Sequence, residues 1–226
     1  MADRSIVAIG GWPWCADEEI RCLQRFILSV ARGSRILYVP TAHAEDADTI
    51  LQMHGAWRGL GEVSHLAFFP WPPAHLREYA LAHDVILVGG GNTANMLAVW
   101  RVHGFDAILR EAWESGVVLA GWSAGMICWF EAGVTDSFGP QLEGMHDGLR
   151  FLDGSACPHY DAEERRRPVY RELVDGGFPG GYAADDGVAL RFSGTEIVEA
   201  VSCRAGGRAY RVERGSEEPL ETRLLA

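Results

Sequence analysis

The sequence Gly121-Trp122-Ser123-Ala124-Gly125 has the pattern G-x-S-x-G and directly follows the short apolar segment Val117–Ala120. In this pattern the serine lies on a sharp turn between a strand and a helix, and the two glycines leave room for the neighbouring backbone. The N-terminus of the next helix, expected near Ala124, presents free N–H groups and a positive partial charge to an oxyanion. We therefore predict that Ser123 is a nucleophile. The alternative is a tight turn with an incidental serine.

A nucleophilic serine needs a base, and the chain has eight histidines. Most of them lie in predicted helices or at strand entries among polar neighbours, where a surface role is expected. His159 differs because it follows Cys157-Pro158, which indicates extended or turn geometry at the end of an element. We predict that His159 is the base, and His146, in a glycine-rich polar stretch, is the second candidate.

The base in turn needs a carboxylate that orients it, and the segment after the serine helix offers two. Asp136 lies in a loop of small residues, and Glu131 lies at the expected C-terminus of the helix, where a carboxylate is unfavourable unless it has a partner. We predict a triad in the chain order Ser123, Asp136, His159, with Glu131 left open as the alternative acid.

A second turn, Gly89-Gly90-Gly91-Asn92-Thr93-Ala94, follows an apolar strand and opens a helix. The pattern satisfies G-x-G-x-x-A, the fingerprint of dinucleotide-binding proteins. However, it follows the fourth predicted strand rather than the first, and Glu111, about 20 residues further on, falls within a helical pattern. A glycine N–H of this turn is the better candidate for a second oxyanion donor beside that of Ala124. A turn without chemistry is the third interpretation.

Composition excludes several classes of protein. The chain has 226 residues, 48% apolar and 23% charged, and a net charge of −11 that disfavours general nucleic-acid binding. All 20 basic residues are arginine, which excludes Schiff-base enzymes and P-loop NTPases that need a lysine. The five cysteines are scattered and contain no CxxC pair, so we expect buried thiols in a reducing compartment and no structural zinc. No signal-peptide or membrane-spanning pattern is found, and we expect a cytoplasmic protein.

The elements that must position these residues alternate between strand and helix. Short apolar runs such as Ser5–Gly11, Arg35–Ala42 and Asp84–Gly91 are separated by segments of helical period. This alternation predicts a doubly wound α/β fold, with a mostly parallel sheet covered by helices on both faces, over roughly the first 130 residues. Short alternating segments after about Gly176 predict antiparallel strands. We interpret residues 1–226 as one domain, with 177–226 as its β-rich extension and no second core.

The combination of the glycine turn, the Gly121–Gly125 pattern and Pro158-His159-Tyr160, followed by an arginine-rich helix, resembles the peptidase E family of serine peptidases, which are relatives of cyanophycinase. The similarity spans most of Ile36 to Asp186. It implies a flavodoxin-like fold similar to that of class I glutamine amidotransferases. It also implies the triad Ser123, His159 and Asp136, an oxyanion hole formed by Gly91 and Ala124, and no metal or cofactor.

Peptidase E cleaves dipeptides with an N-terminal aspartate, and the resemblance places a recognition arginine for that side chain at Arg166. Guanidinium and carboxylate match in bidentate geometry. The alternative is that Arg165-Arg166-Arg167 and its acidic neighbours form a solvated helix face. Asn92 is a further candidate for substrate binding.

The sequence therefore predicts a serine peptidase that hydrolyses dipeptides or short peptides near a free N-terminus through an acyl-enzyme. Its expected partner is a short peptide, with no nucleic acid and no membrane, and a homodimer is left open. Two other interpretations are kept: a nucleotide-binding oxidoreductase that uses Gly89–Asn92, and a catalytically inactive relative of peptidase E that serves as a binding protein.

Overall fold

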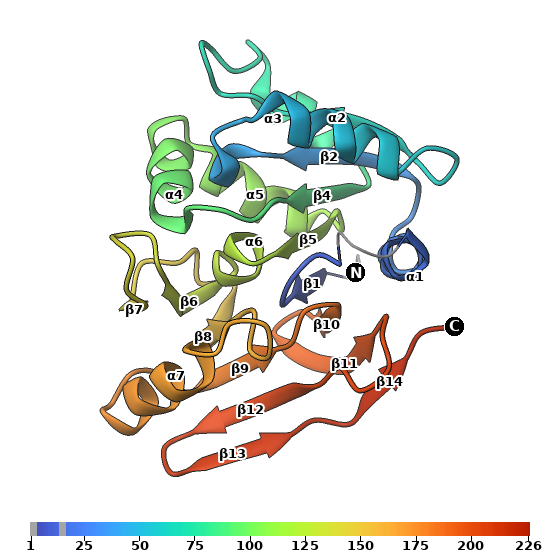
Figure 1. The fold of residues 1–226 in the computed structure, drawn as a ribbon. Coiled ribbons are helices and arrows are strands. Elements are labelled where there is room, and N and C mark those ends of the chain that lie inside the picture. Colours follow the sequence, from blue (N-terminus) through green and yellow to red (C-terminus); the bar gives the residue numbers. More distant parts are fainter. Residues whose placement is uncertain (1–3, 14–16) are drawn as a thin grey trace.

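The computed structural model describes residues 4–13 and 17–226, which form two sheets and the helices around them (Figure 1). The first sheet has eight strands in the spatial order β14-β11-β10-β1-β5-β4-β2-β3. Their bounds along the chain are β1 (Ser5–Ile9), β2 (Arg35–Val39), β3 (Glu62–His65), β4 (Val85–Val88), β5 (Val118–Trp122), β10 (Val188–Ser193), β11 (Glu196–Ser202) and β14 (Thr222–Leu224).

The strands β1, β5, β4, β2 and β3 are parallel to one another, as predicted for a doubly wound domain. Both faces of this sheet are buried, because alternate residues of one strand enter different apolar clusters. In β1, Ile6 and Ala8 pack on one side while Val7 and Ile9 pack on the other. This two-sided burial explains why the strands are continuous apolar runs.

Helices cover both faces of the sheet, and two of them, α4 (Thr93–Val102) and α6 (Ala124–Ile127), begin directly after the glycine-rich turns at the ends of β4 and β5. One face packs against α1 (Asp17–Val30) and α2 (Ala47–Ala56). The other face packs against α3 (Leu76–Leu81), α4, α5 (Phe105–Glu114) and α6, and a 3-10 turn, η1 (Thr41–His43), follows β2. The predicted α/β class is confirmed, and so are the antiparallel strands near the C-terminus, where β10 pairs antiparallel with both β1 and β11.

The sequence did not reveal the second sheet, which has six strands in the order β13-β12-β9-β8-β6-β7. Its strands are β6 (Phe130–Thr135), β7 (Glu143–Met145), β8 (Leu152–Cys157), β9 (Gly181–Ala184), β12 (Ala209–Glu213) and β13 (Ser216–Pro219). The helix expected to run from Ala124 through Phe130 ends at Ile127, and a strand begins at Phe130. Ala124 to Phe130 are all buried, so no polar face separates helix from strand in the sequence pattern.

The second sheet and α7 (Arg166–Asp175) enclose a third apolar cluster that includes Cys157, Tyr170 and Val212. This cluster is smaller than the two apolar clusters on the faces of the first sheet. The chain passes directly from β9 in the second sheet to β10 in the first, so the C-terminal segment contributes strands to both sheets (Figure 1). That residues 1–226 form one domain stays a prediction.

The cysteines within the described residues, Cys22, Cys128, Cys157 and Cys203, are buried free thiols, as expected, and Cys15 lies outside those residues. Burial raises the pKa of Cys157 to about 12, which makes this thiol a core group rather than a nucleophile. In the described part of the chain, no helix combines the length and apolar character that crossing a bilayer requires.

Candidate active site

Ser123 lies between β5 and α6 in a backbone conformation that residues other than glycine rarely adopt. Its φ is 56° and its ψ is −113°, a region that costs about 1–3 kcal/mol and occurs mainly at functional sites. Two glycines permit this turn. A Cβ at Gly121 would lie 2.6 Å from the carbonyl oxygen of Gly125, and a Cβ at Gly125 would contact the backbone of Val88 in β4. The Ser123 hydroxyl does not cap α6, so it remains available at the half-buried strand end.

His159 follows β8 and is hydrogen-bonded to an aspartate that the sequence analysis did not select. Its Nδ1 lies 2.7 Å from Oδ1 of Asp186, in the turn between β9 and β10. The histidine side chain is 21% exposed and the aspartate side chain is 35% exposed. The carboxylate fixes the ring and accepts a hydrogen bond from the protonated Nδ1, which leaves Nε2 as the free nitrogen.

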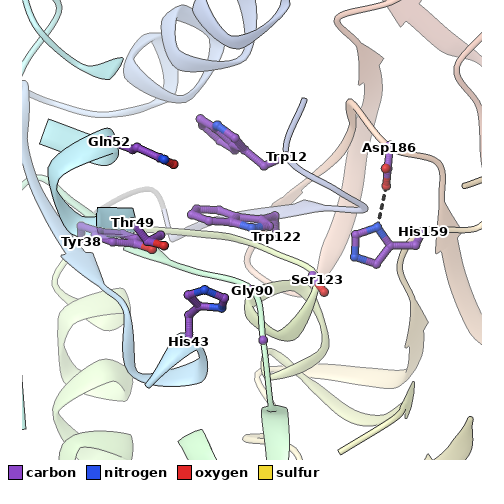
Figure 2. Close-up of a pocket in the computed structure, with 11 residues that line it drawn as sticks. Trp12, Tyr38, His43, Thr49, Gln52, Gly90, Trp122, Ser123, His159 and Asp186 are labelled. Carbon is purple, nitrogen blue, oxygen red and sulfur yellow. Dashed lines mark hydrogen bonds and ion pairs between the residues drawn. The ribbon is translucent and has the colours of Figure 1, made fainter. Parts of the chain in front are cut away.

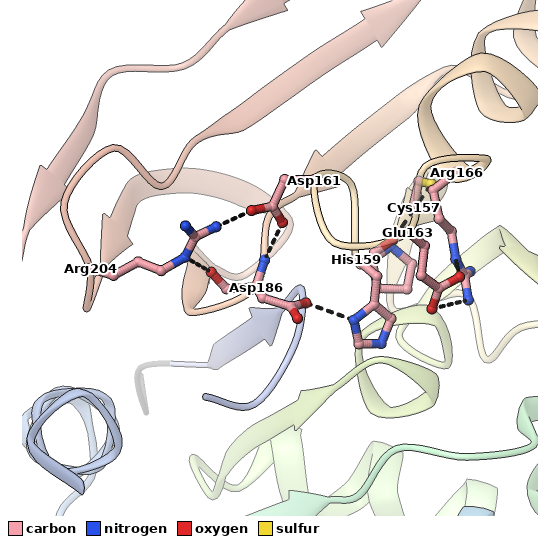
Figure 3. A network of polar contacts seen from close by, with 8 residues as sticks. Cys157, His159, Asp161, Glu163, Arg166, Asp186 and Arg204 are labelled. Carbon is pink, nitrogen blue, oxygen red and sulfur yellow. Dashed lines mark hydrogen bonds and ion pairs between the residues drawn. The ribbon is translucent and has the colours of Figure 1, made fainter. Parts of the chain in front are cut away.

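The backbone of Asp186 is held by two further side chains (Figure 3). Asp161 accepts a hydrogen bond from the Asp186 N–H at 3.0 Å, and Arg204 Nε donates to the Asp186 carbonyl at 2.6 Å. Arg204 also forms an ion pair with Asp161. Both polar groups of the Asp186 backbone are therefore fixed by one charged pair, which restricts the position of its carboxylate.

Gly11, at the end of β1, allows this pair to approach the first sheet. A Cβ at this position would overlap the Asp186 carboxylate and lie 2.9 Å from Nδ1 of His159. The Gly11 carbonyl accepts a hydrogen bond of 2.9 Å from the N–H of Gly187. The strand end Gly10-Gly11-Trp12 is thus part of the site, because it forms the surface on which the pair of side chains rests.

These residues share one cleft of about 470 Å³, within the range of about 300–1,000 Å³ that is typical of small-molecule sites. Figure 2 shows Ser123 and His159 next to each other at one end, with Asp186 behind the histidine. The cleft is lined by Trp12, Tyr38, His43, Thr49, Gln52, Gly90, Gly91, Trp122, Ser123, His159 and Asp186. The structure thus brings together the predicted serine and histidine, and it replaces their predicted acid.

Asp136 does not contact His159. It is exposed, in the turn that follows β6, while Nδ1 of His159 is already occupied by Asp186. The expectation that Asp136 orients the histidine is therefore corrected to Asp186. The open alternative, Glu131, also has another partner, because its Oε1 accepts the N–H of Gly154 at 3.1 Å. The second candidate for the base, His146, packs against Phe178 outside the cleft.

The two predicted substrate-binding side chains do not line the cleft either. Arg166 is 3% exposed, and its guanidinium donates to Glu163 at 2.7 Å and to the Val134 carbonyl at 2.8 Å. Glu163 neutralises its charge (Figure 3), and its bond to the Val134 carbonyl in β6 holds α7 against the second sheet. Asn92 caps α4 by accepting the Asn95 N–H at 2.9 Å, and its amide donates to the Ser137 carbonyl at 2.9 Å. In this structure both side chains make intramolecular contacts outside the cleft, and their role in substrate binding stays a prediction.

The proposed oxyanion donors lie at the two glycine-rich turns. Gly91 lines the cleft with φ of 129°, and a Cβ there would contact the backbone of Ala42. This glycine is thus explained by the close approach of η1, without a dinucleotide. Within residues 4–13 and 17–226, the backbone N–H groups of Gly91 and Ala124 make no intramolecular hydrogen bond, so both are free to donate to a ligand.

A second acid, Asp185, precedes Asp186 in the β9–β10 turn. Burial raises the pKa of Asp185 to about 6, although its carboxylate accepts a hydrogen bond from the Arg208 N–H. Among the described residues, no group of three or more His, Cys, Asp or Glu side chains is arranged to hold a metal ion.

Comparison with known proteins gives a consistent result. The model of peptidase family S51 matches residues 7–200 of the chain. The chain is 45% identical over 225 residues to the uncharacterized peptidase YgaJ of Bacillus subtilis (strain 168), covering 98% of this chain and 97% of the relative. The fold is similar to that of a crystal structure assigned to peptidase E from Listeria monocytogenes EGD-e, with a TM-score of 0.67, 20% identity and coverage of 87% of this chain and 98% of the other. A peptidase from an acI-B1 Actinobacterium has the same TM-score of 0.67 at 18% identity, covering 97% and 95%.

Proposed function

Because the chain belongs to peptidase family S51, a family of serine peptidases, we propose that it hydrolyses short peptides with Ser123 as the nucleophile, His159 as the general base and Asp186 as the acid that orients the histidine. One observation carries this assignment. The strained Ser123 turn and the hydrogen-bonded His159–Asp186 pair, which come from different sheets, line the same cleft.

The first step is attack by Ser123 on a peptide carbonyl carbon. Nε2 of His159 removes the hydroxyl proton, and Asp186 stabilises the imidazolium that forms, through the hydrogen bond to Nδ1. The N–H groups of Gly91 and Ala124 donate to the carbonyl oxygen as it becomes negative, and the N-terminus of α6 adds its positive partial charge.

In the second step the tetrahedral intermediate collapses. Nε2 returns its proton to the nitrogen of the leaving amine, the C–N bond breaks, and the acyl group remains as an ester on Ser123. Water, deprotonated by Nε2 of His159, then attacks the ester carbon. The bond between the acyl carbon and Oγ of Ser123 breaks, Nε2 returns the proton to Oγ, and the carboxylic acid is released. These residues supply the nucleophile, the proton transfers and the oxyanion contacts.

Cleavage of dipeptides or short peptides at a free N-terminus is part of the same proposal, supported by the volume of the cleft and by the resemblance to peptidase E. The preference for N-terminal aspartate has lost its support in this chain, since Arg166 is engaged by Glu163 and does not line the cleft.

The test is a comparison of wild type and Ser123→Ala on a set of dipeptides, with a fluorophosphonate probe that labels only activated serines. We expect labelling of the wild type alone and a loss of kcat on the order of 10³ or more in the variant, with unchanged folding. Equal turnover by both proteins would reject Ser123 as the nucleophile. If the wild type shows neither labelling nor turnover, the protein is an inactive relative that serves as a binding protein.

A further inference from the structure

The cleft extends well beyond the catalytic residues, and the part furthest from Asp186 has no role in the steps above. We call this part the distal end. It is formed by residues from the end of β1, from β2, η1, α2 and the end of β5. Its members are Trp12, Tyr38, His43, Thr49, Gln52 and Trp122. Figure 2 shows these side chains on the side of Ser123 opposite to Asp186.

The wall of the distal end is aromatic. The rings of Tyr38 and Trp122 are nearly parallel, 3° apart with centroids 5.9 Å from each other, and Trp12 packs at 4.9 Å from Trp122. All three side chains are nearly fully buried, so the surface that they present to the cleft is rigid. A rigid wall of aromatic rings favours a flat, apolar group, which stacks on it at a small entropic cost.

Among the described residues, the distal end contains no permanently charged side chain. The chain has no lysine, and no arginine lines the cleft within the described residues. The hydroxyl of Thr49 is already used, because it lies 2.8 Å from Oδ1 of Asp46, the acid that caps α2. A substrate carboxylate placed here would lose its hydration without gaining a cationic partner. Acidic side chains are therefore disfavoured at the distal end.

Tyr38, which lines the distal end, carries a buried hydroxyl group. Its hydroxyl is buried and has no hydrogen-bond partner among the described residues, which is uncommon for a buried phenol. Burial raises the pKa of this phenol, so it remains protonated and can donate. The oxygen lies against Gly89, where a Cβ would come within 2.8 Å of it, so the phenol forms part of the cleft wall beside the glycine turn.

From this geometry we propose that the distal end binds the side chain of the substrate residue whose carbonyl is attacked, and that it selects an uncharged aromatic side chain, phenylalanine or tyrosine, over aspartate. The inference rests on the proposed function, because it uses Ser123 as the point of attack. It fixes the substrate class as peptides with an N-terminal aromatic residue.

The experiment measures kcat/KM for four dipeptides that differ only in the first residue: Phe-Leu, Tyr-Leu, Leu-Leu and Asp-Leu. The assay is run at pH 8, where imidazoles of ordinary pKa are neutral. We expect Phe-Leu and Tyr-Leu to exceed Asp-Leu by about tenfold or more. Fluorophosphonate labelling of the same samples reports the reactivity of Ser123 independently of the dipeptide.

A gain of function tests the location of the pocket. Gln52 is exposed and lines the distal end, so Gln52→Arg places a cation there with little risk to folding. The matched control is Leu51→Arg, the same charge on the adjacent residue of α2, which is 69% exposed and does not line the cleft. We expect Gln52→Arg to raise kcat/KM for Asp-Leu about tenfold through a charge-assisted hydrogen bond, and Leu51→Arg to leave it near the wild-type value.

The outcomes separate this inference from the proposed function. Labelling together with a preference for Asp-Leu, or labelling without turnover of any of the four dipeptides, overturns the aromatic specificity and leaves the serine mechanism standing. Equal effects of Gln52→Arg and Leu51→Arg overturn the assignment of the distal end. Absence of both labelling and turnover rejects the proposed function, and the inference with it.

Discussion

Replacement of Asp186 by asparagine is the most direct test of the corrected triad. Asp186→Asn retains the size of the side chain but presents an amide to Nδ1 of His159, which the carboxylate contacts at 2.7 Å. The matched control is Asp136→Asn, the same change at the exposed position that sequence reasoning had selected. The Asp186 side chain is 35% exposed and its backbone is held separately by Asp161 and Arg204, so folding should survive the substitution.

The expected loss has two parts. A hydrogen bond to a charged group contributes about 1.5–3 kcal/mol, which corresponds to roughly 10- to 160-fold in rate. The amide also reverses the tautomer, because an N–H that faces Nδ1 makes this nitrogen the acceptor and leaves the ring proton on Nε2, where it cannot act as a base. Together these effects predict a decrease in kcat of about 10³- to 10⁴-fold for Asp186→Asn. Asp136→Asn should remain within about twofold of wild type, as expected for a surface substitution.

The measurement is steady-state hydrolysis of the best dipeptide substrate by the three proteins, with the rate of fluorophosphonate labelling as a second readout and thermal unfolding as the control for folding. The reasoning would be refuted by a large loss in Asp136→Asn, or by an Asp186→Asn enzyme with nearly normal turnover. A loss of activity that accompanies a lowered Tm in Asp186→Asn would point instead to a structural role of the β9–β10 turn.

Three further substitutions have distinct expected results. Gly11→Ala should lower kcat/KM by about 100-fold, because the new Cβ displaces the Asp186 carboxylate and His159; an unchanged rate of serine labelling would contradict this. Arg166→Met should lower the free energy of unfolding by about 1–3 kcal/mol in urea, since the Val134 carbonyl loses its donor. The variant should leave the ratio of Asp-Leu to Phe-Leu hydrolysis unchanged. A selective loss of activity on Asp-Leu would restore Arg166 as a specificity residue. Asp185 has a pKa raised to about 6 in the folded protein, above its unfolded value of about 3.9, so its contribution to stability is fully present below pH 4 and is lost between about pH 4 and 6. In the wild type the free energy of unfolding should therefore fall between pH 4 and pH 7, and in Asp185→Asn this fall should be smaller by on the order of 3 kcal/mol. Urea unfolding of both proteins at the two pH values measures it. An identical fall in both proteins would show that Asp185 is not its source.

Much of the first sheet could be predicted from the sequence because its signals are local. Buried parallel strands are continuous apolar runs, and the Ser123 turn is defined by two glycines that the packing of β4, β5 and α6 requires. His159 was selected from eight histidines by its position after Pro158 at the end of a predicted strand. In each case the information lies within a few residues of the position concerned.

The second sheet was missed for a physical reason. Its strands β6 and β8 contain Gly133 and Gly154, and β6 follows a short helix, Ala124–Ile127, that is buried on all sides. Glycine lowers strand propensity, and complete burial removes the alternation that identifies a half-exposed strand. The pairing of β6 with β8 and of β8 with β9 is set by contacts between distant segments, and tertiary packing overrides the weak local preference.

The placement of Arg166 and Asn92 outside the cleft has a different origin. Both side chains are polar and lie close in sequence to candidate site residues, but sequence proximity does not say where a side chain points. The structure uses Arg166 to neutralise Glu163 and to bind the Val134 carbonyl, and it uses Asn92 to cap α4 and hold Ser137. A buried guanidinium and a helix cap consume the donors that a substrate would need.

The acid was missed because it lies where the chain passes from one sheet to the other. The turn Asp185-Asp186-Gly187 leaves β9 of the second sheet and enters β10 of the first, and Gly11 at the end of β1 pairs with Asp186. Only this crossing brings a carboxylate of the C-terminal segment to a histidine that follows β8 and a serine that follows β5. The one local signal was a pair of acids at a strand end followed by glycine, a pattern that also marks ordinary turns. The site is thus completed by the junction of the two sheets, so a perturbation of that junction should affect catalysis before it affects folding.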